Sequence, residues 1–227
     1  MVLLVQRMRQ LVAAAVFPLI GYRPRRVSAQ TWDREYRDGK WRYLREMENI
    51  GGLASILGYC EHLNPQTILD VGCGEGLLAK KLKLLPYGSY LGLDISREAI
   101  AQAQNLADHR TRFVVAEADA FQWDGTFDVI VFSQILYYLP DPAATIVRYR
   151  GMLAPEGRII FSVYDSPRTR EAWRVVKRAC KVEDEMTITQ GTCQTITAVL
   201  HFDGRGAHVR SPGASAGLKC AHAHEPV

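Results

Sequence analysis

Cysteines are few and scattered in this chain of 227 residues. The five are Cys60, Cys73, Cys180, Cys193 and Cys220. Their spacing gives no Cys-x-x-Cys pair and no cluster with histidine, so we predict neither a disulfide framework nor a zinc site. Reduced thiols indicate a cytoplasmic protein.

Long apolar runs and a strong charge imbalance are also missing. The run Leu11–Ile20 has ten residues and contains Pro18, which makes it too short to cross a bilayer. The net charge is only +4, and much of the surplus lies before residue 46. The basic residues form no recognisable nucleic-acid-binding module, so we predict no nucleic-acid partner.

What the chain does have is a glycine-rich stretch between an apolar strand and a helix. Residues 68–71 predict a short buried strand, and a helix is predicted from Leu77 onward. Between them lie Gly72, Gly74 and Gly76. Because glycine has no Cβ and tolerates a positive φ, a ligand can lie directly against this backbone. The pattern therefore predicts a nucleotide-binding loop that opens a helix.

Asp70 separates the candidate cofactors. Dinucleotide dehydrogenases favour G-x-G-x-x-G and normally lack an acid two residues before the first glycine. A carboxylate at that position suits a cationic ligand with an amino group, and S-adenosylmethionine carries both a sulfonium and an α-ammonium. Asp70–Gly76 resembles motif I of the class I S-adenosylmethionine-dependent methyltransferases.

The resemblance covers roughly residues 30–202. It implies an α/β fold: a Rossmann-like seven-stranded sheet of order 3-2-1-4-5-7-6, with strand 7 antiparallel and helices on both faces. Apolar runs predict further strands at 89–95, 112–116, 127–132 and 159–164, and a hairpin at 185–190 and 192–202. The turn 154–158, with Pro155 and Gly157, before the fifth strand is a further mark of the family.

The resemblance also implies which residues hold the cofactor. Asp94, at the end of the second strand, matches the acid that accepts hydrogen bonds from both ribose hydroxyls, whereas Ser96 is the better helix cap. Asp119 is expected at the adenine amino group, with Glu117 as the fallback, and Ser133 lies in the motif beside the methionine end. The full expected set is Asp70, Gly72, Cys73, Gly74, Gly76, Asp94, Ile95, Asp119, Ala120, Ser133 and Gln134.

Aromatic residues before the sheet resemble the lid of small-molecule methyltransferases. Trp32, Tyr36 and Trp41 fit this pattern, and simple core packing would explain them equally well. The sequence contains no compelling general base, and Tyr36, Tyr138 and Glu35 are the catalytic candidates by position. We recognise no metal-binding acid pair and expect metal-independent transfer.

The acceptor is predicted only by class. The run Leu136-Tyr137-Tyr138-Leu139 resembles the nodulation N-methyltransferases, which act on an amino sugar of a lipo-oligosaccharide. We therefore expect a methyl group to move to an oxygen or nitrogen of a small molecule or saccharide. A catalytically silent cofactor-binding subunit that regulates a partner is the alternative. A nicotinamide oxidoreductase is disfavoured by Asp70.

The two ends of the chain are expected to lie outside the methyltransferase domain, 30–202. Residues 1–29 form an apolar segment with arginines, for which three alternatives stay open. These are an interfacial helix that gives peripheral membrane contact through residues 1–26, a helix packed on the protein's own surface, and a cleaved signal. The tail, 203–227, lacks core residues and is expected to be disordered. The sequence does not predict the oligomeric state.

Overall fold

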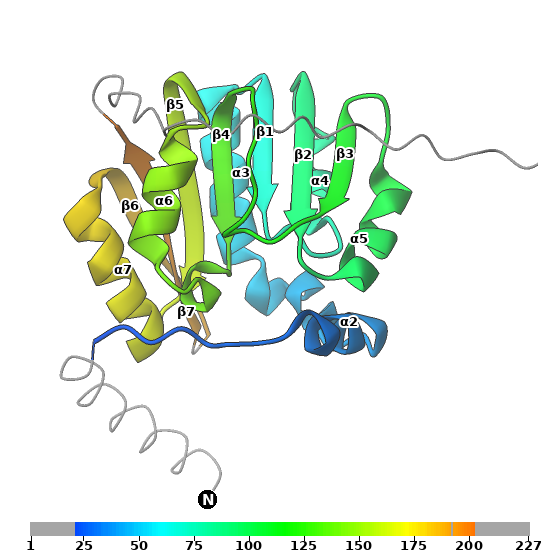
Figure 1. Ribbon diagram of the computed structural model, residues 1–227, viewed down its shortest axis with the longest axis horizontal. Helices are drawn as coiled ribbons and strands as arrows, with labels where there is room; N and C mark the ends of the chain where they lie inside the picture. Colours follow the sequence, from blue (N-terminus) through cyan, green and yellow to red (C-terminus); the bar gives the residue numbers. More distant parts are fainter. Residues whose placement is uncertain (1–20, 192, 203–227) are drawn as a thin grey trace, which may run out of the picture.

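A single mixed sheet organises the molecule (Figure 1). The computed structural model describes residues 21–191 and 193–202. Within them seven strands are arranged in the order β3-β2-β1-β4-β5-β7-β6, and β7 runs antiparallel to β5 and β6. The strands are β1 Thr67–Val71, β2 Ser89–Asp94, β3 Thr111–Val115, β4 Phe127–Ser133, β5 Leu153–Tyr164, β6 Lys181–Gln190 and β7 Cys193–His201. The predicted fold class and strand order are confirmed.

Helices cover both faces of the sheet. The α-helices are α2 Ala29–Arg37, α3 Gly51–Leu63, α4 Leu77–Leu82, α5 Arg97–Ala103, α6 Pro142–Arg150 and α7 Pro167–Ala179. Short 3-10 turns are η1 Arg42–Arg45, η2 Met47–Asn49, η3 Gln104–Leu106 and η4 Leu136–Tyr138. Helices α6 and α7 contribute to one buried cluster with the sheet, and α3, α4 and α5 to the other. Helix α2 lies below the carboxyl ends of the parallel strands (Figure 1).

Strand β1 is buried on both faces, as its apolar run predicts. Leu69 and Val71 join the cluster of α6 and α7, whereas Ile68 joins that of α3, α4 and α5. Because successive side chains alternate, Asp70 points to the same face as Ile68. An ionisable group is thus placed at the centre of the sheet, where only a specific function would retain it.

Two predicted boundaries were wrong, for a shared reason. Strand β5 begins at Leu153 rather than 159, because the predicted turn is a bulge within the strand. Phe127 pairs with Leu153 and Val129 with Arg158, so β5 carries extra residues between these two pairs. Strand β6 begins at Lys181 rather than 185, and a second register shift falls between Val182 and Asp184. Bulges interrupt the alternation from which strand ends are read.

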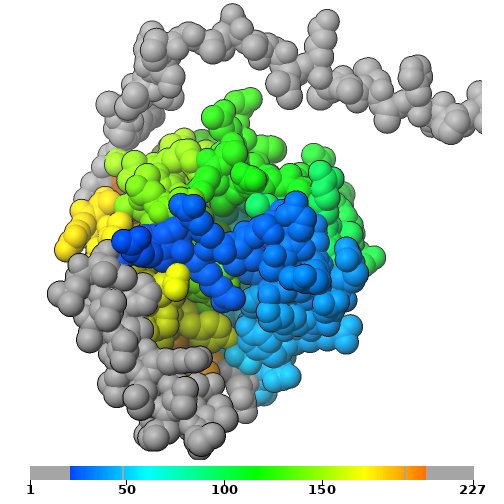
Figure 2. Space-filling model, turned by 60° about the horizontal axis from the view of Figure 1, so that its bottom comes forward, coloured from blue at the N-terminus to red at the C-terminus, as the bar shows by residue number. Residues whose placement is uncertain are grey.

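Residues 21–28 form an extended strap across the carboxyl edge of the sheet (Figures 1 and 2). The Tyr22 hydroxyl donates to the carbonyl of Leu139 at 2.6 Å, and the amide of Arg25 donates to the carbonyl of Tyr137 at 3.0 Å. This part of the N-terminal segment therefore packs on the protein in extended form, and the choice among the three alternatives for residues 1–26, which rest mostly on residues 1–20, stays open. Residues 1–20 and 203–227 lie outside the described part.

Candidate functional site

A cavity of about 470 Å³ opens at the carboxyl ends of β1, β2 and β4, a volume suited to a small-molecule ligand. Its floor is the glycine loop after β1 and the ends of the neighbouring strands. Its outer walls are the strap, α2, η1 and η4. Figure 2 shows the strap and the lid helices, in blue, covering this face. The predicted site is thus enclosed both by segments that precede the glycine loop in the sequence and by a segment that follows it.

The glycine loop has the positive φ values that its sequence predicts. Gly72, Gly74 and Gly76 have φ values of 74°, 55° and 81°. The amides of Gly72 and Cys73 donate to the carbonyl of Leu93 at 2.7 and 2.9 Å, which ties the loop to the end of β2. Gly72, Cys73 and Gly74 line the cavity.

Gly76 has a different task from the other two glycines. It caps the N-terminus of α4 and is not among the residues that line the cavity. A Cβ at this position would lie 2.9 Å from a methyl of Leu106 and 3.3 Å from the ring of Phe113. Its place in the expected cofactor set stays a prediction, and the geometry gives it a packing role.

Asp70 is the least satisfied charged group of the site. It is 1% exposed and lines the cavity floor. Its Oδ2 accepts a hydrogen bond from the Tyr90 hydroxyl at 2.6 Å, and its Oδ1 has no partner among the described residues. Burial raises the pKa of Asp70 to about 7. An ammonium group in the cavity would supply the missing donor and stabilise the ionised form, so the residues present fit the amino group of S-adenosylmethionine.

Asp94 joins β2 to the glycine loop. Its Oδ1 accepts from the amide of Ser96 at 2.8 Å and its Oδ2 from the amide of Gly74 at 3.0 Å. Burial raises its pKa. These bonds do not fill the acceptor capacity of the carboxylate, so ribose hydroxyls can still donate to it. Ser96 caps α5 through Ala99, as the sequence indicated, and Ile95 lines the cavity beside Asp94.

The two residues expected at the adenine are placed differently. Asp119 lines the cavity, and its Oδ1 accepts from the hydroxyl of Thr145 at 3.0 Å. Ala120 is not among the lining residues, and its amide donates to the carbonyl of Glu117 at 3.1 Å. Glu117, the fallback, also lines the cavity.

Gln134 closes the end of β4 in a conformation that few side chains adopt. Its φ is 60°, and both Gln134 and Ser133 line the cavity. The amide of Gln134 donates to the carbonyl of Ser162 at 2.7 Å, and its Oε1 accepts from the amide of Tyr164 at 3.0 Å. These two bonds hold the strained loop against β5.

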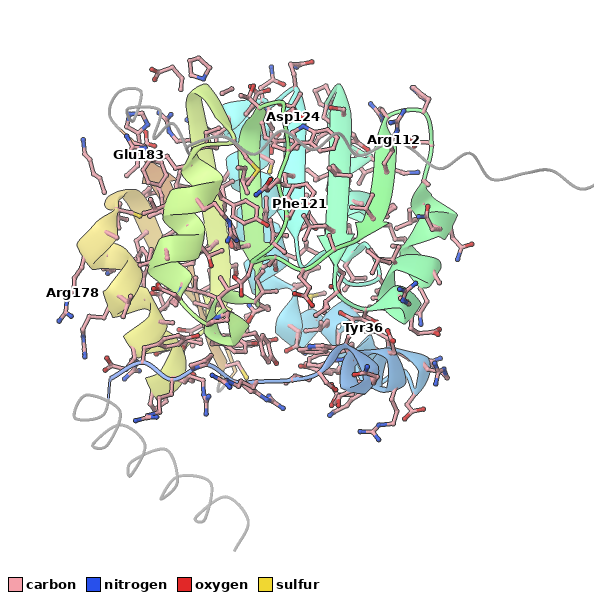
Figure 3. All side chains as sticks on the ribbon, viewed as in Figure 1. Tyr36, Arg112, Phe121, Asp124, Arg178 and Glu183 are labelled. Carbon is pink, nitrogen blue, oxygen red and sulfur yellow. The ribbon has the colours of Figure 1, made fainter. Side chains whose placement is uncertain are left out.

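The lid is an aromatic cluster. The rings of Trp32 and Trp41 lie 5.3 Å apart, and those of Trp32 and Tyr138 lie 4.9 Å apart, edge to face. Figure 3 shows Tyr36 between α2 and the strand ends, and a Cβ on Gly74 would lie 2.7 Å from its hydroxyl. Trp32, Tyr36, Trp41 and Tyr138 all line the cavity. These rings therefore pack on one another beside the cavity, and their role as a lid stays a prediction.

None of the three catalytic candidates is a ready base. Burial raises the pKa of Tyr36 well above its usual value and also raises that of Tyr138, so both phenols are neutral donors near pH 7. Glu35 is not among the lining residues and forms an ion pair with Lys40. Among the described residues, no group of three His, Cys, Asp or Glu side chains could hold a metal ion. Metal-independent transfer stays a prediction.

The strap supplies lining residues that the sequence did not indicate. Arg25, Arg26 and Val27 contribute to the cavity wall. The arginine-rich run suggested membrane anchors instead, because nothing local shows that it crosses the sheet edge. None of the described helices has the length and hydropathy needed to cross a membrane.

Asp33 holds α2, which carries part of the aromatic lid, against the start of α5. Its Oδ1 accepts from the Ser96 hydroxyl at 2.7 Å and from the Glu98 amide at 3.2 Å, which lowers the pKa of Asp33. We expect Asp33→Ala to weaken the docking of α2 by about 1–2 kcal/mol, the loss of a cap-type interaction. Hydrogen exchange should then be roughly 5–30-fold faster in α2 and unchanged in β1.

The same contact should fail in acid. Because the pKa of folded Asp33 is depressed, its stabilisation is present above the ordinary carboxyl pKa and is lost as pH falls through the folded value. Asp38→Ala, at the exposed end of α2, is the control. Equal α2 exchange in the two variants would show that Asp33 does not hold the lid.

Comparison with protein families gives one match that covers most of the chain. The family model described as "Methyltransferase domain" matches residues 31–197. Among curated proteins, the ubiquinone biosynthesis O-methyltransferase of Paraburkholderia xenovorans is 35% identical over 107 residues, which are 44% of this chain and 45% of that protein. The enzyme of the same name from Albidiferax ferrireducens is 31% identical over 148 residues, 61% of this chain and 55% of that protein. The chain thus spans about half the length of these relatives.

Solved structures share the fold. The N-methyltransferase NodS from Bradyrhizobium japonicum, in complex with S-adenosyl-L-homocysteine, superimposes with a TM-score of 0.64 at 20% identity. The match covers 76% of this chain and 96% of that one. At this identity the likeness shows the fold alone, and it agrees with the resemblance seen in the sequence.

Proposed function

The chain belongs to the methyltransferase domain family, and on this premise we propose that it transfers a methyl group from S-adenosylmethionine to an oxygen or nitrogen of a small molecule or saccharide. The observation that carries the proposal is the buried Asp70 carboxylate, whose second oxygen lacks a partner at the floor of the cavity. The O-methyltransferase names of the curated relatives support the same chemistry.

When bound, S-adenosylmethionine supplies a methyl group on a sulfonium that is already a good leaving group. The chain's own residues then bind and orient. Asp70 would face the ammonium, Asp94 the ribose hydroxyls, and the backbone of Gly72 and Gly74 the space between them. Ser133 and Gln134, which line the cavity, would lie beside the methionine end of the cofactor. Proximity and alignment are the main contributions that such a site makes to a displacement reaction.

The aromatic lid excludes water. Trp32, Trp41 and Tyr138 cover the cavity with apolar ring faces, and desolvation of this kind strengthens electrostatic interactions beneath the lid. A base is needed only if the acceptor arrives protonated. Tyr36 and Tyr138 are proposed as hydrogen-bond donors that position the acceptor. Glu35, paired with Lys40, is the weaker candidate.

Asp94→Ala tests the cofactor site. We expect S-adenosylhomocysteine to bind the wild-type protein and to bind this variant about 1–3 kcal/mol more weakly, since hydrogen bonds to a charged group are lost. Isothermal titration calorimetry measures both, and Asp124→Ala, on the exposed loop before β4, is the control. Unchanged affinity in Asp94→Ala would remove this acid from the site, and binding of NADH would favour an oxidoreductase.

The alternative is a silent subunit that binds the cofactor and regulates a partner. It is favoured by the lack of a ready base among Glu35, Tyr36 and Tyr138, and turnover of any acceptor by the isolated chain would exclude it. A cytoplasmic location and peripheral membrane contact through residues 1–26 are also proposals. The location rests on the scattered cysteines and the membrane contact on the apolar run and arginines of the sequence. The packed strap, 21–28, is no support for the membrane contact.

A further inference from the structure

Two arginines at the cavity mouth form no ion pair with an acid among residues 21–191 and 193–202. Arg25 and Arg26 are exposed and line the cavity, and the guanidinium carbon of Arg25 lies 5.7 Å from the ring centroid of Tyr138. The ion pairs found among the described residues involve other cations. An arginine fork next to an aromatic wall is well suited to bind a planar or tetrahedral oxyanion.

The backbone that carries these arginines is held in place. Tyr22 bonds the Leu139 carbonyl, the amide of Arg25 bonds the Tyr137 carbonyl, and the side chain of Arg168 donates to the carbonyl of Arg23 at 3.1 Å. The strap is therefore anchored next to η4 and on α7, and the backbone from which both guanidinium groups extend has a fixed position. Little ordering of the backbone would be needed when a ligand binds.

The charges that line the cavity are segregated. The lining carboxylates come from the loops and strand ends of β1, β2 and β3: Asp70, Glu75, Asp94, Glu117 and Asp119. The lining cations are Arg25 and Arg26, beside the loop after β4. A cofactor with a sulfonium and an ammonium matches the acidic side. The basic side is then left for a second ligand of opposite charge.

We propose that the methyl acceptor carries an anionic group, a carboxylate or a phosphate, which Arg25 and Arg26 bind at the cavity mouth. The body of the acceptor then lies against Tyr138 and Tyr43, below the strap. This inference rests on the proposed function and narrows its acceptor class. The alternative ligand of Arg25 and Arg26 is the carboxylate of the cofactor's methionine part. The test below distinguishes these two ligands.

The test uses the full chain saturated with S-adenosylhomocysteine and titrated with probe pairs that differ in charge. Benzoate with benzamide examines a carboxylate, and glucose 6-phosphate with glucose examines a phosphate. We expect the anionic member of at least one pair to bind roughly tenfold more tightly, as a charge-assisted hydrogen bond gives. Which pair responds identifies the anion. Added salt should reduce the preference.

Variants of the strap locate the effect. Arg25→Gln with Arg26→Gln should abolish the preference and leave S-adenosylhomocysteine affinity within about twofold. Arg23→Gln, on the same strap but not among the lining residues, should keep the preference.

Three results would overturn the inference: equal binding within both pairs, a preference that survives the double variant, or weaker S-adenosylhomocysteine binding by the double variant. The last would assign the arginines to the cofactor. Failure of the wild-type protein to bind S-adenosylhomocysteine would instead refute the proposed function.

Discussion

Asp70→Asn should lower the affinity for S-adenosylmethionine by at least about thirtyfold and, at pH 8, make the free protein more stable. The first effect follows from loss of the charge that faces the cofactor's ammonium, since breaking a desolvated charge pair costs on the order of 2–5 kcal/mol. The second follows from the burial of a carboxylate that lacks a cationic partner in the free protein.

The pH dependence of the second effect has a definite sign. The pKa of Asp70 is raised from 3.8 to about 7 in the folded chain. Its stabilising contribution is therefore full below the ordinary carboxyl pKa and is lost as pH rises through about 7. Asparagine has no such titration. We expect a gain of about 1–3 kcal/mol at pH 8, after the cost of burying the amide, and less at pH 5.

Urea unfolding at pH 5 and pH 8 measures the stability, and calorimetry measures the affinity. Glu61→Gln removes an exposed carboxylate from α3 and serves as the control. A variant that binds the cofactor normally would disprove the role of Asp70 as the ammonium partner. A stability difference independent of pH would show that Asp70 is ionised in the free protein at both pH values.

Gly72→Val should have the largest effect on folding. Gly72 has a φ of 74°, which a β-branched residue rarely adopts, and a Cβ there would lie 2.3 Å from the Cγ2 methyl of Ile135. Backbone strain and overpacking each cost on the order of 1–3 kcal/mol, so we expect a loss of about 2–6 kcal/mol and no measurable S-adenosylhomocysteine binding.

Two further variants separate the effect of the clash with Ile135 from that of the backbone strain. Gly58→Ala, in the middle of α3 with nothing within 4 Å of its Cβ, should gain about 0.5–1 kcal/mol. Combining Gly72→Val with Ile135→Ala removes the clash but leaves the φ strain, so part of the loss should return. Urea unfolding curves decide among these outcomes. If Gly72→Val were as stable as Gly58→Ala, the loop would have a second accessible backbone conformation.

The sequence predicted which residues come together at the floor of the cavity because their determinants are local. Asp70 and Asp94 each end an apolar strand, and the glycines between them follow a short fixed spacing. In a parallel sheet, such strand ends meet at one edge whatever the details of packing. The strand order came from the family resemblance, and the structure confirms it.

The strap, the docking of α2 and the conformation of Gln134 could not be predicted in the same way. The Tyr22 hydroxyl bonds carbonyls 114 and 117 residues away, a pairing that no local pattern encodes. The hydrogen bond between Ser96 and Asp33 spans 63 residues and depends on how the lid docks. Gln134 adopts a positive φ that its residue type does not predict. Its side chain accepts a hydrogen bond from the amide of Tyr164, a contact that no local pattern indicates.

The cavity is lined by a buried carboxylate and by two exposed arginines, and this difference in exposure has a consequence for the order of binding. Asp70 is 1% exposed, whereas Arg25 and Arg26 are exposed and belong to the strap itself. If both proposals hold, an acceptor bound by the arginines would lie over the cofactor, and we expect the methyl donor to bind first and its demethylated form to leave last. Under the proposed function, turnover then follows a compulsory order, and the demethylated product competes with fresh donor for the empty protein.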